Sequence, residues 1–263
     1  MSERGIIWLA ADLDGTLFHS RWDRQPEDLV VDSYEETPCA YLSPHLLDML
    51  DTLPSDVRVV PVTTRSLRQY RRIQWPDGRE PALIVASNGG SLLRSGEVDH
   101  AWSRTAFQIA VSHVGEMRML VDWLRAQDAV QSSSMVDSLF VAATCDTPED
   151  AVRLRRALPP TELMSTAVGR KLYLMPPGLD KGAALRRLKK VPETQGARLW
   201  IAAGDSVLDL PMLQEADVAV VPEDLADLLG PGVEIVTVPD KASLGEEALR
   251  TAARLAAEPD GTI

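Results

Sequence analysis

Cysteine and long apolar runs are both scarce in this chain of 263 residues. Its two cysteines, Cys39 and Cys145, and its four histidines follow no spacing that is typical of a zinc site. No apolar run reaches the length that crosses a membrane, and the first one ends at Asp12, too early for a signal peptide. We therefore expect a cytoplasmic protein with reduced thiols, without zinc and without a membrane partner.

Positive charge is also in deficit. The 27 Lys and Arg residues oppose 39 Asp and Glu residues, which gives a formal net charge of -12 at pH 7. Proteins bind nucleic acids and anionic membranes through clustered Lys and Arg, so neither is expected as the main partner. The net charge of the whole chain does not determine the charge of any one pocket, because a pocket in an acidic protein can be locally positive.

Apolar runs alternate with helical patterns along both ends of the chain. With 45% hydrophobic residues, the chain is long enough to bury a sizeable core and to form two domains. Strands that alternate with helices indicate an α/β fold with a Rossmann-like parallel sheet, whose functional residues lie at the carboxyl ends of the strands. The expected strands lie near 6–11, 58–62, 83–87, 199–203, 218–221 and 234–238. The expected helices begin at Ser43 and Ser66 and lie near 180–190, 208–215, 223–229 and 242–257.

Two carboxylates and a glycine follow the first apolar run, in the sequence Asp12-Leu13-Asp14-Gly15-Thr16. Residues i and i+2 of an extended segment point to the same side, so Asp12 and Asp14 are expected to lie together. Such a pair would raise the pKa of one carboxylate, but a bound divalent cation would keep it ionised as a ligand and nucleophile. A simpler interpretation is a strand that ends in an acidic turn.

Three later segments place polar residues at the ends of strands or the starts of helices. Thr63, Thr64 and Arg65 precede a helix, whose N-terminus can bind phosphate, although Thr is also an ordinary N-cap. Lys181 begins a helix, where its charge opposes the helix dipole, so the lysine either has a further role or is simply solvated. The third segment, Gly204-Asp205-Ser206-Val207-Leu208-Asp209, again follows an apolar strand.

Together, the four segments and their order resemble the motifs of the haloacid dehalogenase superfamily of phosphohydrolases, from residue 6 to about residue 221. The resemblance implies a Mg²⁺-dependent phosphatase that works through an aspartyl-phosphate. The implied roles are Asp12 as nucleophile, Asp14 as general acid/base, Thr63 as phosphate ligand, Lys181 as charge partner, and Asp12, Asp14, Asp205 and Asp209 as residues of the metal site.

Within the superfamily, four segments resemble the Cof-type and sucrose-phosphatase-like branch: Thr63-Thr64-Arg65, Ser87-Asn88-Gly89-Gly90, Lys181-Gly182 and Gly204-Asp205. We expect Thr64, Arg65 and Asn88 to bind the substrate or its phosphate, although Arg65 could lie on the surface and Asn88 could merely form a turn. The branch usually has Asn before the last aspartate, whereas this chain has Leu208. Because leucine has no polar side chain, the hydrogen bond that this asparagine would make near the metal is in doubt.

Charge counting supports a magnesium site. Asp12, Asp205 and Asp209 bring three negative charges, which Mg²⁺ and Lys181 balance, and Mg²⁺ prefers oxygen ligands, including those of phosphates. We therefore expect a hydrolase for a small phosphorylated metabolite, such as a sugar phosphate. The alternatives are a phosphotransferase or phosphomutase on the same scaffold, a receiver-like regulatory protein and a non-catalytic protein. The sequence leaves the oligomeric state open.

The middle of the chain contains none of the four motifs. Residues 91–176, which include a long helical segment near 104–126, are expected to form an α+β cap inserted into a catalytic core of residues 1–90 and 177–263. A cap would exclude water and select the substrate, and the alternative is a subdomain without a role in catalysis. The segment from His19 to Tyr41 is long for a connection and forms either a flap beside Asp12 or an idle loop.

Overall fold

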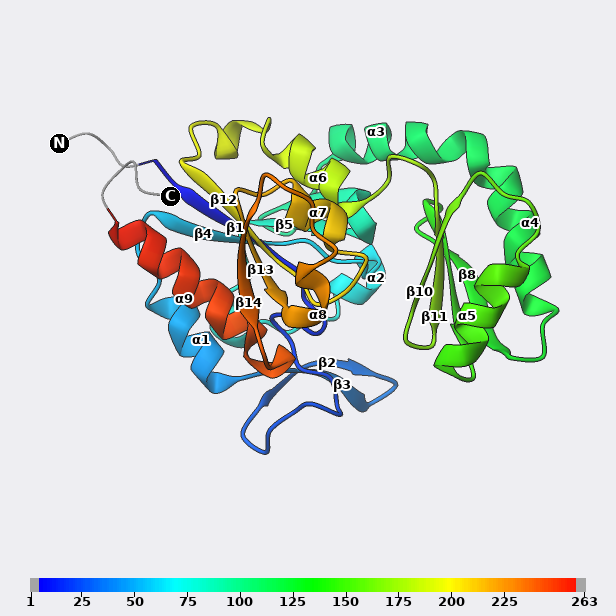
Figure 1. The fold of residues 1–263 in the computed structure, drawn as a ribbon, viewed down its shortest axis with the longest axis horizontal. Coiled ribbons are helices and arrows are strands. Elements are labelled where there is room, and N and C mark those ends of the chain that lie inside the picture. The colour runs from blue at the N-terminus through cyan, green and yellow to red at the C-terminus, as the bar shows by residue number, and fades with distance from the viewer. Residues whose placement is uncertain (1–4, 259–263) are drawn as a thin grey trace.

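The computed structural model describes residues 5–258 and consists of an α/β core and an α+β cap (Figure 1). The core contains a parallel sheet in the order β14 (Glu234–Val238), β13 (Val218–Pro222), β12 (Leu199–Ala203), β1 (Ile7–Ala11) and β4 (Val57–Pro61). A bridge between Val62 and Val85 attaches β5 (Leu83–Ala86) beyond β4. These strands confirm the α/β class that the apolar pattern predicts.

The inner strands β1, β12 and β13 of the core sheet are buried on both faces. In β1, Ile7, Leu9 and Ala11 pack on one face, while Trp8 and Ala10 pack on the other. The first face is covered by α1 (Pro44–Asp51) and α9 (Leu244–Ala257). The second is covered by α6 (Lys181–Leu188), α7 (Leu210–Gln214) and α8 (Glu223–Ala226). Burial on both faces explains why β1, β12 and β13 are continuous apolar runs in the sequence, whereas the edge strand β14 is largely exposed.

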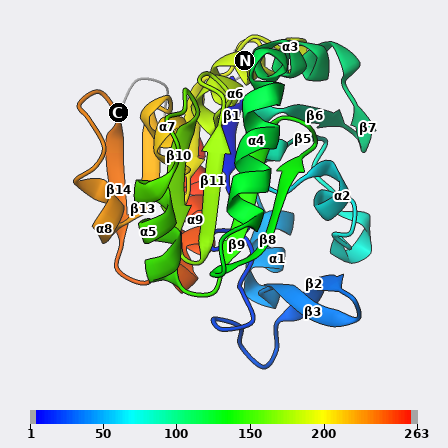
Figure 2. The same ribbon diagram turned by 90° about the vertical axis from the view of Figure 1, so that its right-hand side faces the viewer.

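The cap is built around an antiparallel sheet in the order β10 (Met164–Val168), β11 (Lys171–Met175), β9 (Phe140–Cys145) and β8 (Val130–Val136). Helices α4 (Val114–Arg125) and α5 (Pro148–Ala157) cover the outer face of this sheet, and its inner face is turned towards the core (Figure 2). The predicted core and cap are therefore both present. Among residues 5–258, no helix is long and apolar enough to cross a membrane.

The helix expected near 104–126 is two helices. Helix α3 (His100–Ala110) and α4 are separated by a 3₁₀ turn at Val111–His113. Trp102 of α3 packs in the core, whereas Ala106 and the apolar face of α4 pack in the cap. The chain bends because consecutive turns of the helix pack against different parts of the molecule.

Two further strand segments differ from the sequence-based expectation. The segment β6 (Ser91–Arg94), expected in the insert, pairs with β5 and continues into β7 (Glu97–Val98), so this hairpin extends the core. Strand β8 is not apparent in the sequence because its segment Gln131-Ser132-Ser133-Ser134 is polar.

The segment from His19 to Tyr41 contains a β-hairpin, hereafter the flap. Its strands are β2 (Leu29–Tyr34) and β3 (Thr37–Leu42), and a bridge between His19 and Tyr41 closes its base. Val31, Ala40 and Leu42 pack into the hydrophobic core, so this face of the flap is fixed against the sheet. The remaining helix, α2 (Leu67–Tyr70), is N-capped by Ser66, as the sequence predicts.

Candidate active site

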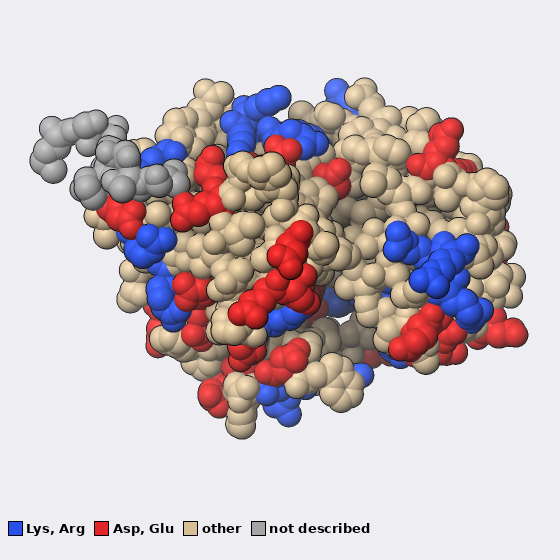
Figure 3. All heavy atoms as spheres, viewed as in Figure 1, with Lys and Arg blue, Asp and Glu red and all other residues tan. Residues whose placement is uncertain are grey.

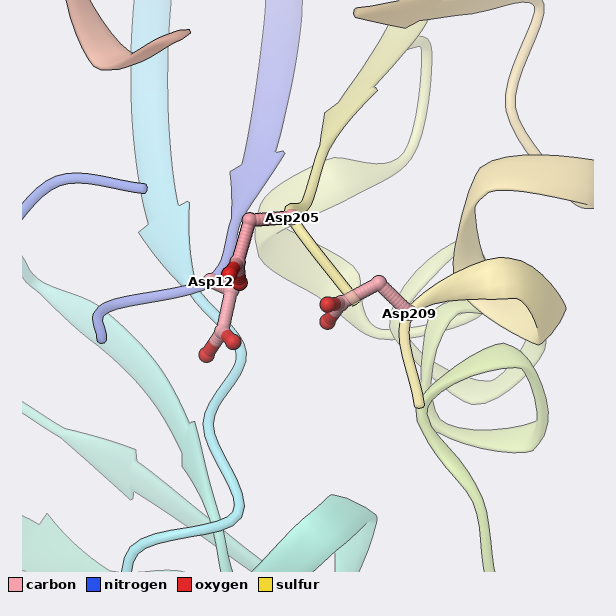
Figure 4. Close-up of side chains that lie close together, drawn as sticks. All are labelled: Asp12, Asp205 and Asp209. Carbon is pink, nitrogen blue, oxygen red and sulfur yellow. The ribbon is translucent and has the colours of Figure 1, made fainter. Parts of the chain in front are cut away.

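Three carboxylates converge at the carboxyl end of the core sheet (Figure 4). Asp12 directly follows β1, Asp205 lies in the loop after β12, and Asp209 precedes α7. One oxygen from each carboxylate lies within 4.8 Å of the other two. Because β1 and β12 are neighbouring parallel strands, the polar residues that follow them lie at the same edge of the sheet.

The close approach of these loops depends on two glycines. Gly15 has a φ of +81°, and a Cβ added there would lie 2.5 Å from Asp205 Oδ2. At Gly204, a Cβ would lie 2.3 Å from the Cβ of Asp209. Any larger residue at either position would displace an acidic side chain.

Lys181 is fully buried between two of the carboxylates. Its Nζ lies 2.8 Å from Asp12 Oδ1 and 2.5 Å from Asp209 Oδ1. Burial alone would lower the pKa of Lys181, but the charges and hydrogen bonds of Asp12 and Asp209 raise it above its usual value. The side chain therefore remains a cation, and the dipole penalty at the start of α6 is offset by these two ion pairs.

Asp209 is held without the asparagine that the resemblance leads one to expect at position 208. Its Oδ2 accepts hydrogen bonds from the N–H and the hydroxyl of Ser206, at 3.0 and 2.8 Å. Leu208 instead packs against the hydrophobic cluster of the cap. Ser206 therefore supplies hydrogen bonds near the acids, while Leu208 joins this loop to the cap.

The acids carry more negative charge than Lys181 compensates. Burial raises the pKa of Asp12 well above its usual value, and the charges of Asp209, Asp14 and Asp205 raise it further, against the effect of Lys181. Burial and the charge of Asp209 raise the pKa of Asp205 to about 6, and this carboxylate forms no ion pair with any residue from 5 to 258. Clustered carboxylate oxygens whose negative charge is only partly compensated are suited to bind a hard divalent cation.

The carboxylate of Asp14 lies apart from the other acids, in contact with Arg65. Both of its oxygens accept hydrogen bonds from the guanidinium, at 2.7 and 2.6 Å. Burial alone would raise the pKa of Asp14, but Arg65 lowers it, with a smaller contribution from the charge of Lys171 on the cap. Because both oxygens are bound to Arg65, we leave the Asp14 side chain out of the metal set.

Arg65 is buried and joins Asp14 to Asp32 of the flap. Its Nη1 donates to Asp32 Oδ2 at 2.6 Å, and Arg72 donates to both oxygens of Asp32 at 3.0 Å. Asp32 is a residue of this site that is not among those predicted from the sequence. The signal was available, since Asp32 follows the apolar pair Val30-Val31 just as Asp12 follows its strand.

Of the other residues expected to bind the substrate or its phosphate, only Thr64 lines the cavity beneath the cap, whereas Thr63 and Asn88 are buried and do not line it. Thr63 is buried, and its hydroxyl accepts a hydrogen bond from the Arg65 N–H at 3.1 Å. Thr64 lines the cavity beneath the cap. The Nδ2 of Asn88 donates to Met175 Sδ and to the Leu179 carbonyl, at 2.8 and 3.2 Å, so Asn88 holds the segment that returns from the cap.

Between the core and the cap lies a cavity of about 490 Å³, and the surface is hollowed between the two parts (Figure 3). Its core wall contains Asp14, Asp32 and Arg65, and its other wall is the inner face of the cap sheet. Next to the cavity, the three-residue turn between β8 and β9 contacts the core, where Asp137 accepts hydrogen bonds from the Ser87 hydroxyl and the Leu67 N–H. Asp14 therefore faces a space that could hold a small molecule.

The sequence matches no protein-family model and is similar to no curated protein. Its fold, however, is similar to solved structures over nearly the whole chain. The sucrose-phosphatase of Synechocystis sp. PCC6803, solved in complex with sucrose and phosphate, gives a TM-score of 0.62 at 15% identity, with 95% of this chain and 98% of that chain covered. A protein related to trehalose-6-phosphate phosphatase gives 0.55 at 16% identity, with coverage of 95% and 98%.

A third similar structure is a phosphatase of the haloalkanoate (HAD) enzyme superfamily from Bacteroides thetaiotaomicron. Its TM-score is 0.54 at 17% identity, with 95% of this chain and 96% of that chain covered. At these identities the similarity establishes the fold. The protein has the fold of the HAD phosphatases, an α/β core with a cap, as the sequence motifs predict.

Proposed function

We propose that the protein is a Mg²⁺-dependent phosphomonoester hydrolase that acts on a sugar phosphate or a similar small metabolite. The observation that carries the proposal is the buried Lys181, which joins Asp12 to Asp209 while Asp205 lies unpaired beside them. Burying charges is costly even when they are paired, so such a cluster is better explained by chemistry on an anionic group than by stability.

Asp12 is the proposed nucleophile. Its Oδ1 accepts a hydrogen bond from the Leu13 N–H at 2.7 Å and contacts Lys181, whereas no donor to its Oδ2 is found among residues 5–258. Attack by Oδ2 on phosphorus forms an aspartyl-phosphate as the bond to the leaving oxygen breaks. Lys181, the Thr63 hydroxyl and the backbone N–H of Asp14 stabilise the charge of the phosphoryl oxygens.

Asp14 is the proposed general acid and base. It protonates the leaving oxygen and then takes a proton from the water that hydrolyses the aspartyl-phosphate. Arg65 keeps Asp14 ionised in the free protein. A bound phosphate dianion adds negative charge beside Asp14 and raises its pKa, so we expect proton uptake to accompany substrate binding.

The proposed metal ligands are Asp12, Asp205 and Asp209. A bound Mg²⁺ would keep these carboxylates ionised and neutralise charge on the substrate phosphate. The clustered oxygens and the unpaired Asp205 fit this role. We expect activity to disappear with EDTA and to return with Mg²⁺ but not with Ca²⁺, whose larger and looser coordination would misplace Asp12. Full turnover in the chelator would remove the metal from the proposal.

The proposed substrate class rests on the cavity and on the similar structures. A volume of about 490 Å³ is in the range of small-molecule sites. One of the similar structures is a sucrose-phosphatase in complex with sucrose and phosphate, and another is a protein related to trehalose-6-phosphate phosphatase. A hydroxyl-bearing phosphate ester of similar size is therefore the first class to test.

The deciding experiment is turnover of p-nitrophenyl phosphate with Mg²⁺ by the Asp12→Asn variant. We expect a loss of at least about 1,000-fold with the fold intact, because an amide does not act as a nucleophile here. Acid-quenched wild-type protein should carry one phosphoryl group on the peptide that contains Asp12. The matched control is Asp48→Asn, an exposed acid on α1. Activity of Asp12→Asn within tenfold of wild type would refute the assignment.

A further inference from the structure

We propose that the cavity beneath the cap selects phosphate esters whose leaving group carries a second anionic group, and that Lys171 binds that group. The inference rests on the proposed function and extends it to the choice of substrate. Lys171 is the first residue of β11 and lines the cavity opposite Asp14.

The charges around the cavity single out Lys171. Its lining contains two carboxylates, Asp14 and Asp32, and three cations, Arg65, Arg72 and Lys171. Arg65 binds both carboxylates, and Arg72 binds Asp32. Lys171 forms no ion pair among residues 5–258, and one positive charge in the cavity is therefore uncompensated in a protein of net charge -12.

The residues beside Lys171 carry hydroxyl groups. In the sheet register, Lys171 pairs with Thr144 of β9, and Thr144 pairs with Ser132 of β8. All three line the cavity, and side chains paired directly across neighbouring strands lie close together. The row presents one cation and two hydroxyls, which are groups that bind a carboxylate or phosphate on a hydroxylated carbon chain.

The position of Asp14 fixes which part of the substrate enters the cavity. Asp12 and Lys181 lie at the sheet edge and receive the phosphoryl group, whereas Asp14, which protonates the leaving oxygen, lines the cavity. The leaving group therefore extends from Asp14 towards the cap. Lys171 lies on the opposite wall, where it meets the far end of that group rather than the phosphate that is cleaved.

The test compares kcat/KM for matched pairs of esters with Mg²⁺. Each pair differs in a second anionic group: glycerol 3-phosphate with 3-phosphoglycerate, sorbitol 6-phosphate with 6-phosphogluconate, and fructose 6-phosphate with fructose 1,6-bisphosphate. For at least one pair, we expect kcat/KM to be about 10- to 100-fold higher for the member with the second anionic group. This is the effect of one charge-assisted hydrogen bond. The preference should fall as salt is added.

Variants at Lys171 locate the source of the preference. In Lys171→Met, kcat/KM should fall about 10- to 100-fold more for the member with the second anionic group than for its partner, mainly through a higher KM. Lys171→Arg should restore most of this preference. The control is Arg170→Met, which removes an equal charge from a neighbouring residue outside the cavity lining. Thermal unfolding shows whether each variant is folded.

The outcomes separate this inference from the proposed function. If the wild type hydrolyses p-nitrophenyl phosphate but prefers neither member of any pair, the inference is wrong and the phosphatase assignment stands. An equal loss for both members in Lys171→Met, or the same selective loss in Arg170→Met, also overturns it. If no ester is hydrolysed with Mg²⁺, the proposed function fails and the inference fails with it.

Discussion

Replacing Arg65 with Met removes the cation that joins the flap to the catalytic acid. Arg65 is 9% exposed and Asp32 is 1% exposed, so their ion pair is shielded from water. Losing one partner of a buried pair costs about 3–5 kcal/mol because the other charge remains buried. Arg72 still binds Asp32 in the variant. We therefore expect a loss near the lower end, about 3 kcal/mol at pH 7, which lowers Tm by about 6–12 °C.

The pH dependence of this loss tests its cause. Burial alone would raise the pKa of Asp32, but Arg72 and Arg65 lower it below its usual value. A carboxylate with a lowered pKa stabilises the fold above its unfolded pKa of about 3.9, and this contribution disappears as the pH falls through the folded value. The difference in unfolding free energy between wild type and Arg65→Met should thus be full at pH 7 and shrink below about pH 4.

The assay is urea unfolding of both proteins across this pH range, with Arg68→Met as the control because Arg68 is an exposed arginine on α2, three residues after Arg65. We expect the control to change stability by less than about 0.5 kcal/mol. A difference for Arg65→Met that stays constant from pH 7 to pH 3 would refute the electrostatic reasoning. It would assign the loss to packing, for example to the contact of Arg65 with the Phe18 ring.

Two further changes test the loops that carry the acids. Gly15→Ala should lower kcat for p-nitrophenyl phosphate by at least about 100-fold in a folded protein, because the new Cβ would lie 2.5 Å from Asp205 Oδ2; turnover within threefold of wild type would contradict the need for this close approach. Leu208→Asn should lower the unfolding free energy by about 1–2 kcal/mol through lost packing with the cap, and should leave kcat within threefold because Ser206 and Lys181 already hold Asp209; a tenfold gain in kcat would show that the asparagine is missed.

The sequence predicts the core well because each of its signals is local. Apolar runs that end in Asp12 or precede Asp205 identify buried strands, and the geometry of a parallel sheet then brings the acids to one edge. The unfavourable place of Lys181 at a helix start leaves a solvated lysine open, and its role as a charge partner follows only from the resemblance to the phosphohydrolase motifs. These rules bring Asp12 and Asp205 together, as in the structure, but they also place Asp14 beside Asp12, whereas the Asp14 carboxylate binds Arg65.

The remainder depends on contacts between distant segments. Asp32 pairs with Arg65 only because the flap folds back onto the sheet, and the local sequence of neither segment indicates this contact. Strand β8 is polar because one of its faces lines a cavity, so it lacks the apolar signature of a buried strand. The break at Val111–His113 reflects two packing partners, which a helical pattern of residues does not reveal.

The order of the strands has a consequence for how the chain folds. Strand β1 lies at the centre of the core sheet between β4 and β12, and β12 follows the whole cap in the sequence. During synthesis, β1 can pair with β4 early, but its other edge has no neighbour until the cap has been made. An exposed apolar strand edge is prone to aggregation. Chains truncated before β12 should therefore aggregate, and the cap, whose strands are contiguous in the sequence, can fold before the sheet that carries it.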